Sequence, residues 1–170
     1  MMDQFEKFTK MSEDGSWQHL TSYENGLAAS FFFRRFFFFS PPPFVVRSKS
    51  GYTPRKHQDA CLFVRNVATE GRGFEFAMFY NDSERRMMVL LQPGSYLEGM
   101  IGFVHGGAVA AILDHTFASC GICAFGIVLT ANLSVNYKSL IPLGSVVLVE
   151  TKVEKVEEKK IFLSGCVQSA

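Results

Sequence analysis

A single apolar stretch, residues 103–129, constrains the fold of this chain more than any other feature. From residue 106 to about residue 125 its apolar side chains recur at helical spacing, and its alanines favour a closely packed helix. Residues 127–137 then alternate between apolar and polar side chains, which predicts a strand with two different faces. His105, Asp114 and His115 interrupt the stretch. Because a charge at the centre of a bilayer is costly, we reject a membrane span.

Alternating segments on both sides of this helix predict further strands. They cover residues 62–66, 73–80, 86–92, 145–156 and 160–168. The links between neighbouring segments are too short for the crossovers of a parallel sheet. The chain is therefore predicted to be of the α+β class, with an antiparallel sheet wrapped around one long helix. Its 170 residues fit one such domain, which we expect at residues 59–170.

Two segments precede this domain. Residues 1–26 predict an N-terminal helical segment of one or two short helices, in which Trp17 anchors the packing. Residues 27–58 contain six basic and no acidic residues, which leaves 11 basic and 16 acidic residues elsewhere. The sequence FFFRRFFFFSPPPF lies in this insert and has neither helical nor strand periodicity, so we expect disorder.

The insert has two possible interpretations. It is either a low-complexity segment that no core requires, or a segment that associates with a membrane surface through its phenylalanines and arginines. The first interpretation is favoured, because the segment lacks the single apolar face that an interfacial helix needs.

Composition excludes several classes of protein. The net charge is only +1, so a dedicated nucleic-acid-binding protein is not expected. Four cysteines are too few for a disulfide scaffold and favour a reducing compartment. Cys120 and Cys123 form a CxxC motif, but no second pair or histidine cluster completes a zinc site, so we expect core thiols. The N-terminal residues, which include Asp3 and Glu6, show no secretory signal or targeting peptide.

The helix carries two features that suit catalysis. Asp114 is a carboxylate among apolar side chains, so it has a partner, faces an interface, or lies on an exposed stripe. His105, Gly106 and Gly107 open the helix, where free N–H groups and the positive end of the helix dipole suit an oxyanion. His105 is equally compatible with a structural loop histidine.

The spacing of these features predicts a shared site. Gly106 and Asp114 lie ~12 Å apart along one helix, so they cannot both contact one carbonyl group. A homodimer with antiparallel helices would bring Gly106 of one chain to Asp114 of the other, giving two equivalent sites. Thr130 and Asn132, on the polar face of the following segment, are candidates to orient Asp114 or its water.

The stretches GFVHGGAVAAILDHTFASCG and IVLTANLSVNYKSLIPLGSVV resemble the hotdog-fold acyl-coenzyme A thioesterases, and EDGSWQHLTSY near the start matches as well. The resemblance covers residues 61–168. It implies a hotdog fold, a homodimer or dimer of dimers with composite sites, and hydrolysis of medium- and long-chain fatty acyl-CoA without a cofactor or a metal. It also implies a C-terminal strand that is missing here, because relatives continue beyond the position of Ala170.

The resemblance also assigns roles by position. It makes Asp114 the catalytic carboxylate, Gly106 the oxyanion amide, Thr130 the hydroxyl residue near the carboxylate, and His105 the histidine before the glycine. Some relatives place an asparagine where this chain has Gly99, which leaves the water-holding arrangement open. The residues expected to contact the substrate, including the phosphates of CoA, are Gly107, Asn132, Asn136, Lys138, Lys159 and Lys160. For the lysines, ordinary solvated surface is the alternative.

A mitochondrial member of the family is a reported partner of the kinase Akt. The resemblance therefore implies the mitochondrion or the cytoplasm as the location and Akt as a partner. Two alternatives to the enzyme stay open, namely a non-catalytic kinase-binding module and an inactive truncated variant that keeps the fold. A hotdog dehydratase is disfavoured, because its chemistry pairs a histidine with a differently placed acid.

Overall fold

A computed structural model of the chain describes residues 2–20, 64 and 71–170. The insert at residues 27–58 lies outside the described residues, and so does the strand expected at residues 62–66 apart from the buried Val64. The elements follow the order α1 (Met2–Glu13), β1 (Gln18–Leu20), β2 (Phe74–Asn81), β3 (Arg86–Pro93), the short helix η3 (Ser95–Leu97), α3 (Gly106–Phe125), β4 (Val147–Glu157) and β5 (Lys160–Ser169).

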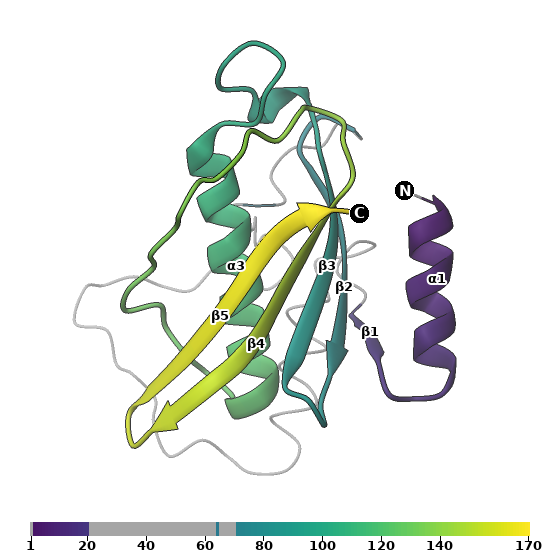
Figure 1. The fold of residues 1–170 in the computed structure, drawn as a ribbon. Coiled ribbons are helices and arrows are strands. Elements are labelled where there is room, and N and C mark those ends of the chain that lie inside the picture. The colour runs from purple at the N-terminus through teal and green to yellow at the C-terminus, as the bar shows by residue number, and fades with distance from the viewer. Residues whose placement is uncertain (1, 21–63, 65–70) are drawn as a thin grey trace, which may run out of the picture.

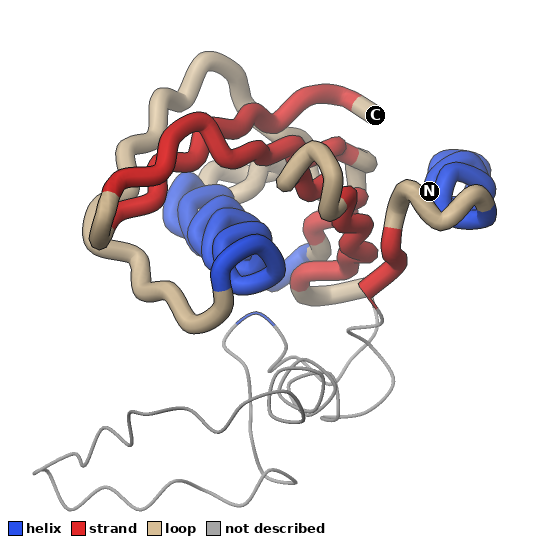
Figure 2. Tube along the Cα trace, turned by 90° about the horizontal axis from the view of Figure 1, so that it is seen from below, coloured by secondary structure: helices blue, strands red, loops and turns tan. Residues whose placement is uncertain are grey.

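The strands form one antiparallel sheet in the order β1-β2-β3-β4-β5, as the α+β prediction requires. α3 crosses one face of this sheet, and α1 stands on the other side (Figure 1). Viewed along α3, the helix lies between the curved sheet and the connection that follows it (Figure 2). Within the described part of the chain, β5 has a single strand neighbour and forms an edge of the sheet.

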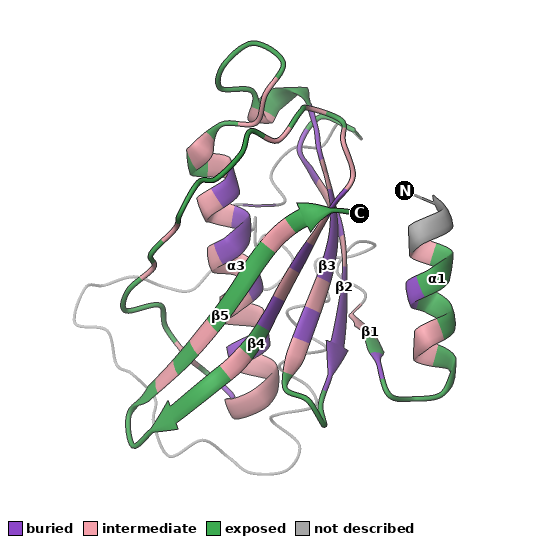
Figure 3. Ribbon diagram, in the orientation of Figure 1, coloured by how far each residue is buried: buried purple, intermediate pink, exposed green. Residues whose placement is uncertain are grey.

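The core lies between β2, β3 and α3. The predicted period-two face of β2 is confirmed, because Phe74, Phe76, Met78 and Tyr80 are all buried in one cluster with the inner side of α3. Figure 3 shows the buried residues gathered on β2, β3 and the side of α3 that faces them, whereas β5 is mostly exposed. This apolar contact fixes the direction of α3 across the sheet and hence the position of its first turn.

The N-terminal segment differs in part from its prediction. Its described residues, 2–20, contain one helix, α1, and the residues after the turn at Gly15 form the short strand β1 instead of a second helical piece. β1 pairs with the free edge of β2, with Gln18 opposite Tyr80. Backbone groups at a sheet edge favour this pairing over an isolated turn of helix. Trp17 is buried as expected, in a second cluster with Phe8 on the outer face of the sheet.

The prediction of a strand at residues 127–137 is wrong for the described structure. This segment is extended but pairs with none of the described strands, because the helix beside it offers side chains instead of a strand edge. It runs antiparallel to α3, with Val128 against Gly121 near one end and Tyr137 against Gly106 near the other. Its polar residues are exposed, as their alternation predicted, but Ile127 and Leu129 are exposed too.

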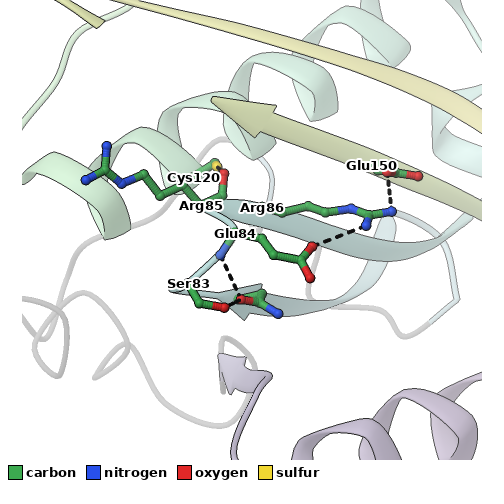
Figure 4. A network of polar contacts seen from close by, with 7 residues as sticks. Ser83, Glu84, Arg85, Arg86, Cys120 and Glu150 are labelled. Atoms are coloured by element: carbon green, nitrogen blue, oxygen red, sulfur yellow. Dashed lines mark hydrogen bonds and ion pairs between the residues drawn. The ribbon is translucent and has the colours of Figure 1, made fainter. Parts of the chain in front are cut away.

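A polar network fastens the β2–β3 turn to β4 (Figure 4). The guanidinium of Arg86 forms ion pairs with Glu84 and with Glu150 of β4. The side-chain oxygen of Asn81 accepts hydrogen bonds from the Ser83 hydroxyl at 2.8 Å and from the Glu84 amide at 3.0 Å. The network lies at the far end of β3 from the loop that leads into α3, so we assign it to the stability of the sheet.

α3 has the length and the mean hydropathy, 1.6, of a helix that could cross a membrane. A core helix packed on a sheet meets the same two criteria. In this fold α3 buries one side against the sheet, where Ile112 and Cys120 are among its least exposed residues. The helix is apolar on its other sides as well, so much of its apolar surface is not covered by the sheet.

Candidate active site

The first turn of α3 leaves one backbone amide free. His105 caps the helix with extended backbone angles (φ −63°, ψ 135°), and its Nδ1 atom accepts the N–H of Gly107 at 2.9 Å. The carbonyl oxygen of His105 accepts the amides of Ala108 and Val109 at 2.9 and 3.1 Å. Within the described residues, the Gly106 N–H is therefore the one amide of this turn without a partner. A free donor at the positive end of a helix suits a developing oxyanion.

The loop before α3 fixes the position of His105. The His105 amide donates to the carbonyl of Leu97 at 2.7 Å, and the Gly99 amide donates to Phe103 at 2.9 Å. A Cβ placed on Gly99 would lie only 2.7 Å from the Cα of His105. The structure therefore has no room for the asparagine that some relatives place here. Gly99 packs closely against His105 and has no side chain that could hold a water molecule.

We expect Gly99→Ala to lower kcat by ~10- to 100-fold, because displacement of a catalytic group by about 1 Å has effects of that order. The added methyl group must push the backbone of His105, and with it the start of α3. Steady-state kinetics of the folded variant would measure this effect. Met100→Ala, in the exposed tip of the same loop, is the matched control. Wild-type kcat in Gly99→Ala would show that the helix start tolerates the shift.

Asp114 lies in the middle of α3, half-buried. Among the described residues, its carboxylate has no hydrogen-bond or ion-pair partner. Because α3 extends unbroken over residues 106–125, the separation of ~12 Å between Gly106 and Asp114 along one helix holds. One chain thus presents an amide and a carboxylate that have no partner in the described part of the chain and that cannot meet on one substrate carbonyl.

Comparisons with known proteins address which chemistry these groups serve. The family model described as thioesterase superfamily matches residues 101–170, which include the whole of α3. Acyl-coenzyme A thioesterase THEM4 of Xenopus laevis is 39% identical over 169 residues, covering 99% of this chain and 68% of the relative. The protein of the same name from Rattus norvegicus is 46% identical and covers 97% of this chain and 67% of that one. The chain belongs to the acyl-CoA thioesterase family.

A solved structure supports the same fold for this family member. The crystal structure of a thioesterase superfamily protein superposes with a TM-score of 0.51 at 26% identity, over 56% of this chain and 46% of the other. The hotdog fold that the sequence predicted is therefore confirmed. The chain spans about two thirds of the length of the THEM4 relatives that it matches.

The structure separates the other candidate residues of this thioesterase into two groups. Thr130, Asn132, Asn136 and Lys138 are exposed on the connection that runs along α3, and Lys138 follows Tyr137 next to the helix start. Lys159 and Lys160 lie at the turn between β4 and β5, at the same end of the molecule as the C-terminal end of α3 and away from the start of that helix (Figure 1). These two lysines do not join the Gly106 amide within one chain.

Sequence reasoning missed Tyr137. Its hydroxyl donates to the carbonyl oxygen of Gly106 at 2.9 Å, and its ring covers the same residue. A contact between a side chain and a backbone carbonyl 31 residues away has no signal in hydrophobic periodicity.

The thiols of the CxxC motif are core groups in this thioesterase. Burial raises the pKa of Cys120 to about 11. Burial, and then the nearby Cys120, raise the pKa of Cys123 to about 12. Thiolates are the reactive form, so burial disfavours either group as a nucleophile at neutral pH. In the described part of the chain, no cluster of three histidine, cysteine, aspartate or glutamate side chains is placed to hold a metal.

Proposed function

We propose that this chain hydrolyses medium- and long-chain fatty acyl-CoA thioesters to free fatty acid and CoA. The observation that carries the proposal is the unpaired Gly106 amide at the positive end of α3, in a chain of the acyl-CoA thioesterase family. A thioester oxygen bound there gains a hydrogen bond and a favourable dipole as negative charge develops on it. THEM4 relatives from frog and rat carry acyl-coenzyme A thioesterase in their names.

We propose that the active unit is a homodimer or a dimer of dimers. Gly106 of one chain binds the thioester oxygen, and Asp114 of the partner subunit reaches the carbonyl carbon. Two observations support this arrangement. The two groups lie ~12 Å apart within one chain. Moreover, large apolar side chains are exposed in the segments that precede and follow an incompletely covered apolar helix, with Ile101 and Leu129 each 90% exposed. Exposed apolar surface of this kind is typical of interfaces between subunits.

Asp114 has two possible routes in this dimer. As a general base it takes a proton from water, whose oxygen bonds to the carbonyl carbon while the carbon–sulfur bond breaks and CoA leaves as a thiol. As a nucleophile it forms a mixed anhydride and releases CoA, and water then hydrolyses the anhydride. Thr130 and Asn132 are placed on the segment alongside α3 to orient the carboxylate or the water in either route.

CoA carries several phosphate charges, which the exposed lysines can bind as point charges. Lys138 and Asn136 lie on the segment that Tyr137 attaches to the helix start, so we assign them to the chain that binds the thioester oxygen. Lys159 and Lys160 lie near the other end of α3. In a dimer with antiparallel helices, both lysines belong to the chain that supplies Asp114 and lie beyond that carboxylate, so we assign them to the site at the partner's Gly106.

Release of CoA thiol from palmitoyl-CoA and from shorter acyl-CoA substrates tests the proposed function. A chromogenic thiol reagent, run beside analytical ultracentrifugation, would report turnover and oligomeric state together. We expect turnover on medium and long acyl chains by a dimeric or larger species. Absence of thiol release from every acyl-CoA by a folded dimer would contradict the enzyme and leave the non-catalytic alternative.

Binding to the kinase Akt and a mitochondrial or cytoplasmic location are further proposals, based on the family resemblance alone. Co-precipitation with purified Akt would test the first of them. Because a binding surface needs no turnover, Asp114→Asn should still bind Akt. Loss of Akt binding in that variant would count against a separate binding role.

A further inference from the structure

Tyr137 makes a contact with α3 that the proposed chemistry does not yet use. Its hydroxyl donates to the carbonyl oxygen of Gly106 at 2.9 Å. A Cβ built on Gly106 would lie 3.5 Å from the ring atom Cε1, so the tyrosine ring packs directly over the glycine. The contact attaches the extended connection after α3 to the first turn of the same helix.

The peptide group between Gly106 and Gly107 is held at both ends. Its carbonyl accepts from Tyr137, and its N–H donates to Nδ1 of His105 at 2.9 Å. Hydrogen bonds at the two ends of one peptide group polarise it and strengthen each other. Tyr137, this peptide and His105 therefore form one continuous chain of hydrogen bonds. Because Nδ1 accepts, the proton of the neutral imidazole ring is on Nε2.

The held peptide neighbours the peptide that carries the free amide. The two peptide groups meet at the Cα of Gly106, and glycine has no side chain to restrict rotation there. The peptide that carries the free N–H is held by the His105 carbonyl, which accepts the amides of Ala108 and Val109. Tyr137 adds a second restraint from outside the helix, on the next peptide, and its ring occupies the space over Gly106.

We propose that Tyr137 is a positioning residue for thioester hydrolysis, which holds the Gly106–Gly107 peptide and the His105 cap so that the free Gly106 amide faces the thioester oxygen. This inference rests on the proposed function. It assigns Tyr137 an effect on the transition state, where the oxyanion forms, and not on binding of the CoA moiety.

Tyr137→Phe removes the hydroxyl and keeps the ring. We expect kcat for palmitoyl-CoA to fall about fivefold, which corresponds to the ~1 kcal/mol of a typical hydrogen bond, with KM unchanged. Tyr96→Phe is the matched control, because Tyr96 is also exposed and its hydroxyl bonds to Arg72 at 3.2 Å, away from α3. A purely structural role would lower the melting temperature and leave kcat of the folded enzyme unchanged, so an unchanged kcat would overturn the proposal.

A double-mutant cycle with His105→Ala tests whether Tyr137 acts through this chain of hydrogen bonds. If Tyr137 acts through the peptide and the His105 cap, the double variant loses little more activity than the more damaged single variant. If the activity losses of the two single variants multiply in the double variant, Tyr137 does not act through the His105 cap.

Amide hydrogen exchange without substrate gives a readout that is independent of turnover. We expect faster exchange at Gly107 in Tyr137→Phe than in the wild type or in Tyr96→Phe, because the His105 cap loosens. Equal exchange rates would overturn the contact's positioning role. If exchange at Gly107 is faster in Tyr137→Phe but the wild-type protein hydrolyses no acyl-CoA, the proposed function is refuted and the contact's role in holding the peptide stands.

Discussion

Asp114→Asn lowers kcat for palmitoyl-CoA by ~10³-fold or more, because an amide neither takes a proton from water nor attacks a thioester. The substitution keeps the size of the side chain and removes a charge that has no partner among the described residues. Folding and association should therefore persist. Thiol release measured at saturating substrate, beside sedimentation of the same sample, checks both expectations.

Asp82→Asn is the matched control for this variant. Asp82 is an exposed carboxylate in the β2–β3 turn, where Arg85 contacts Cys120 and Phe125 in the C-terminal half of α3, so its amide variant should keep wild-type kcat. If Asp114→Asn retains more than about a tenth of wild-type kcat, the carboxylate performs neither general base nor nucleophilic catalysis.

Gly106→Pro removes the proposed oxyanion donor with little change to the helix. Gly106 occupies the first helical position, where proline is well tolerated, and His105 already has the extended backbone that precedes proline. The lost N–H has no structural partner among the described residues. We expect kcat to fall ~10²- to 10³-fold, the usual effect of removing one oxyanion-hole donor. Circular dichroism and kinetics of the purified variant measure the fold and the loss separately.

Gly106→Ala separates the lost amide from the changed side chain. It keeps the N–H, and its methyl group meets the Tyr137 ring at an ordinary contact distance of 3.5 Å. We expect it to lose less than about tenfold in kcat, well short of the proline variant. Equal losses in the two variants would mean that the side chain, and not the amide, matters at this position.

The elements with local signals could be predicted from the sequence. α3 has its predicted bounds, because helical spacing starts after the glycine pair and ends at Gly126. The β2–β3 and β4–β5 hairpins also follow the prediction, since alternation and a short turn determine antiparallel pairing. Family membership followed from the motif around His105 and Asp114, because these residues occur at fixed spacing on a single helix.

Features that depend on distant partners could not be predicted. β1 has three residues of mixed polarity, and only the free edge of β2 makes it a strand. Residues 127–137 alternate like a strand, but alternation does not supply a neighbouring strand with which to pair. The sequence predicted free amides at the glycine pair, but the structure was needed to show that the His105 side chain accepts the Gly107 amide and leaves that of Gly106.

Mixing two inactive variants tests most directly whether two chains share each site. In dimers formed by co-expression of Asp114→Asn and Gly106→Pro, a mixed dimer has one site with both wild-type groups and one with neither. Random assortment predicts recovery to about a quarter of wild-type activity. Mixed dimers of a wild-type chain and a chain that carries both substitutions, purified away from the wild-type homodimers, should be inactive, because neither of their sites has both wild-type groups. Activity that stays at the background of the two single variants would contradict a site built from Gly106 of one chain and Asp114 of its partner.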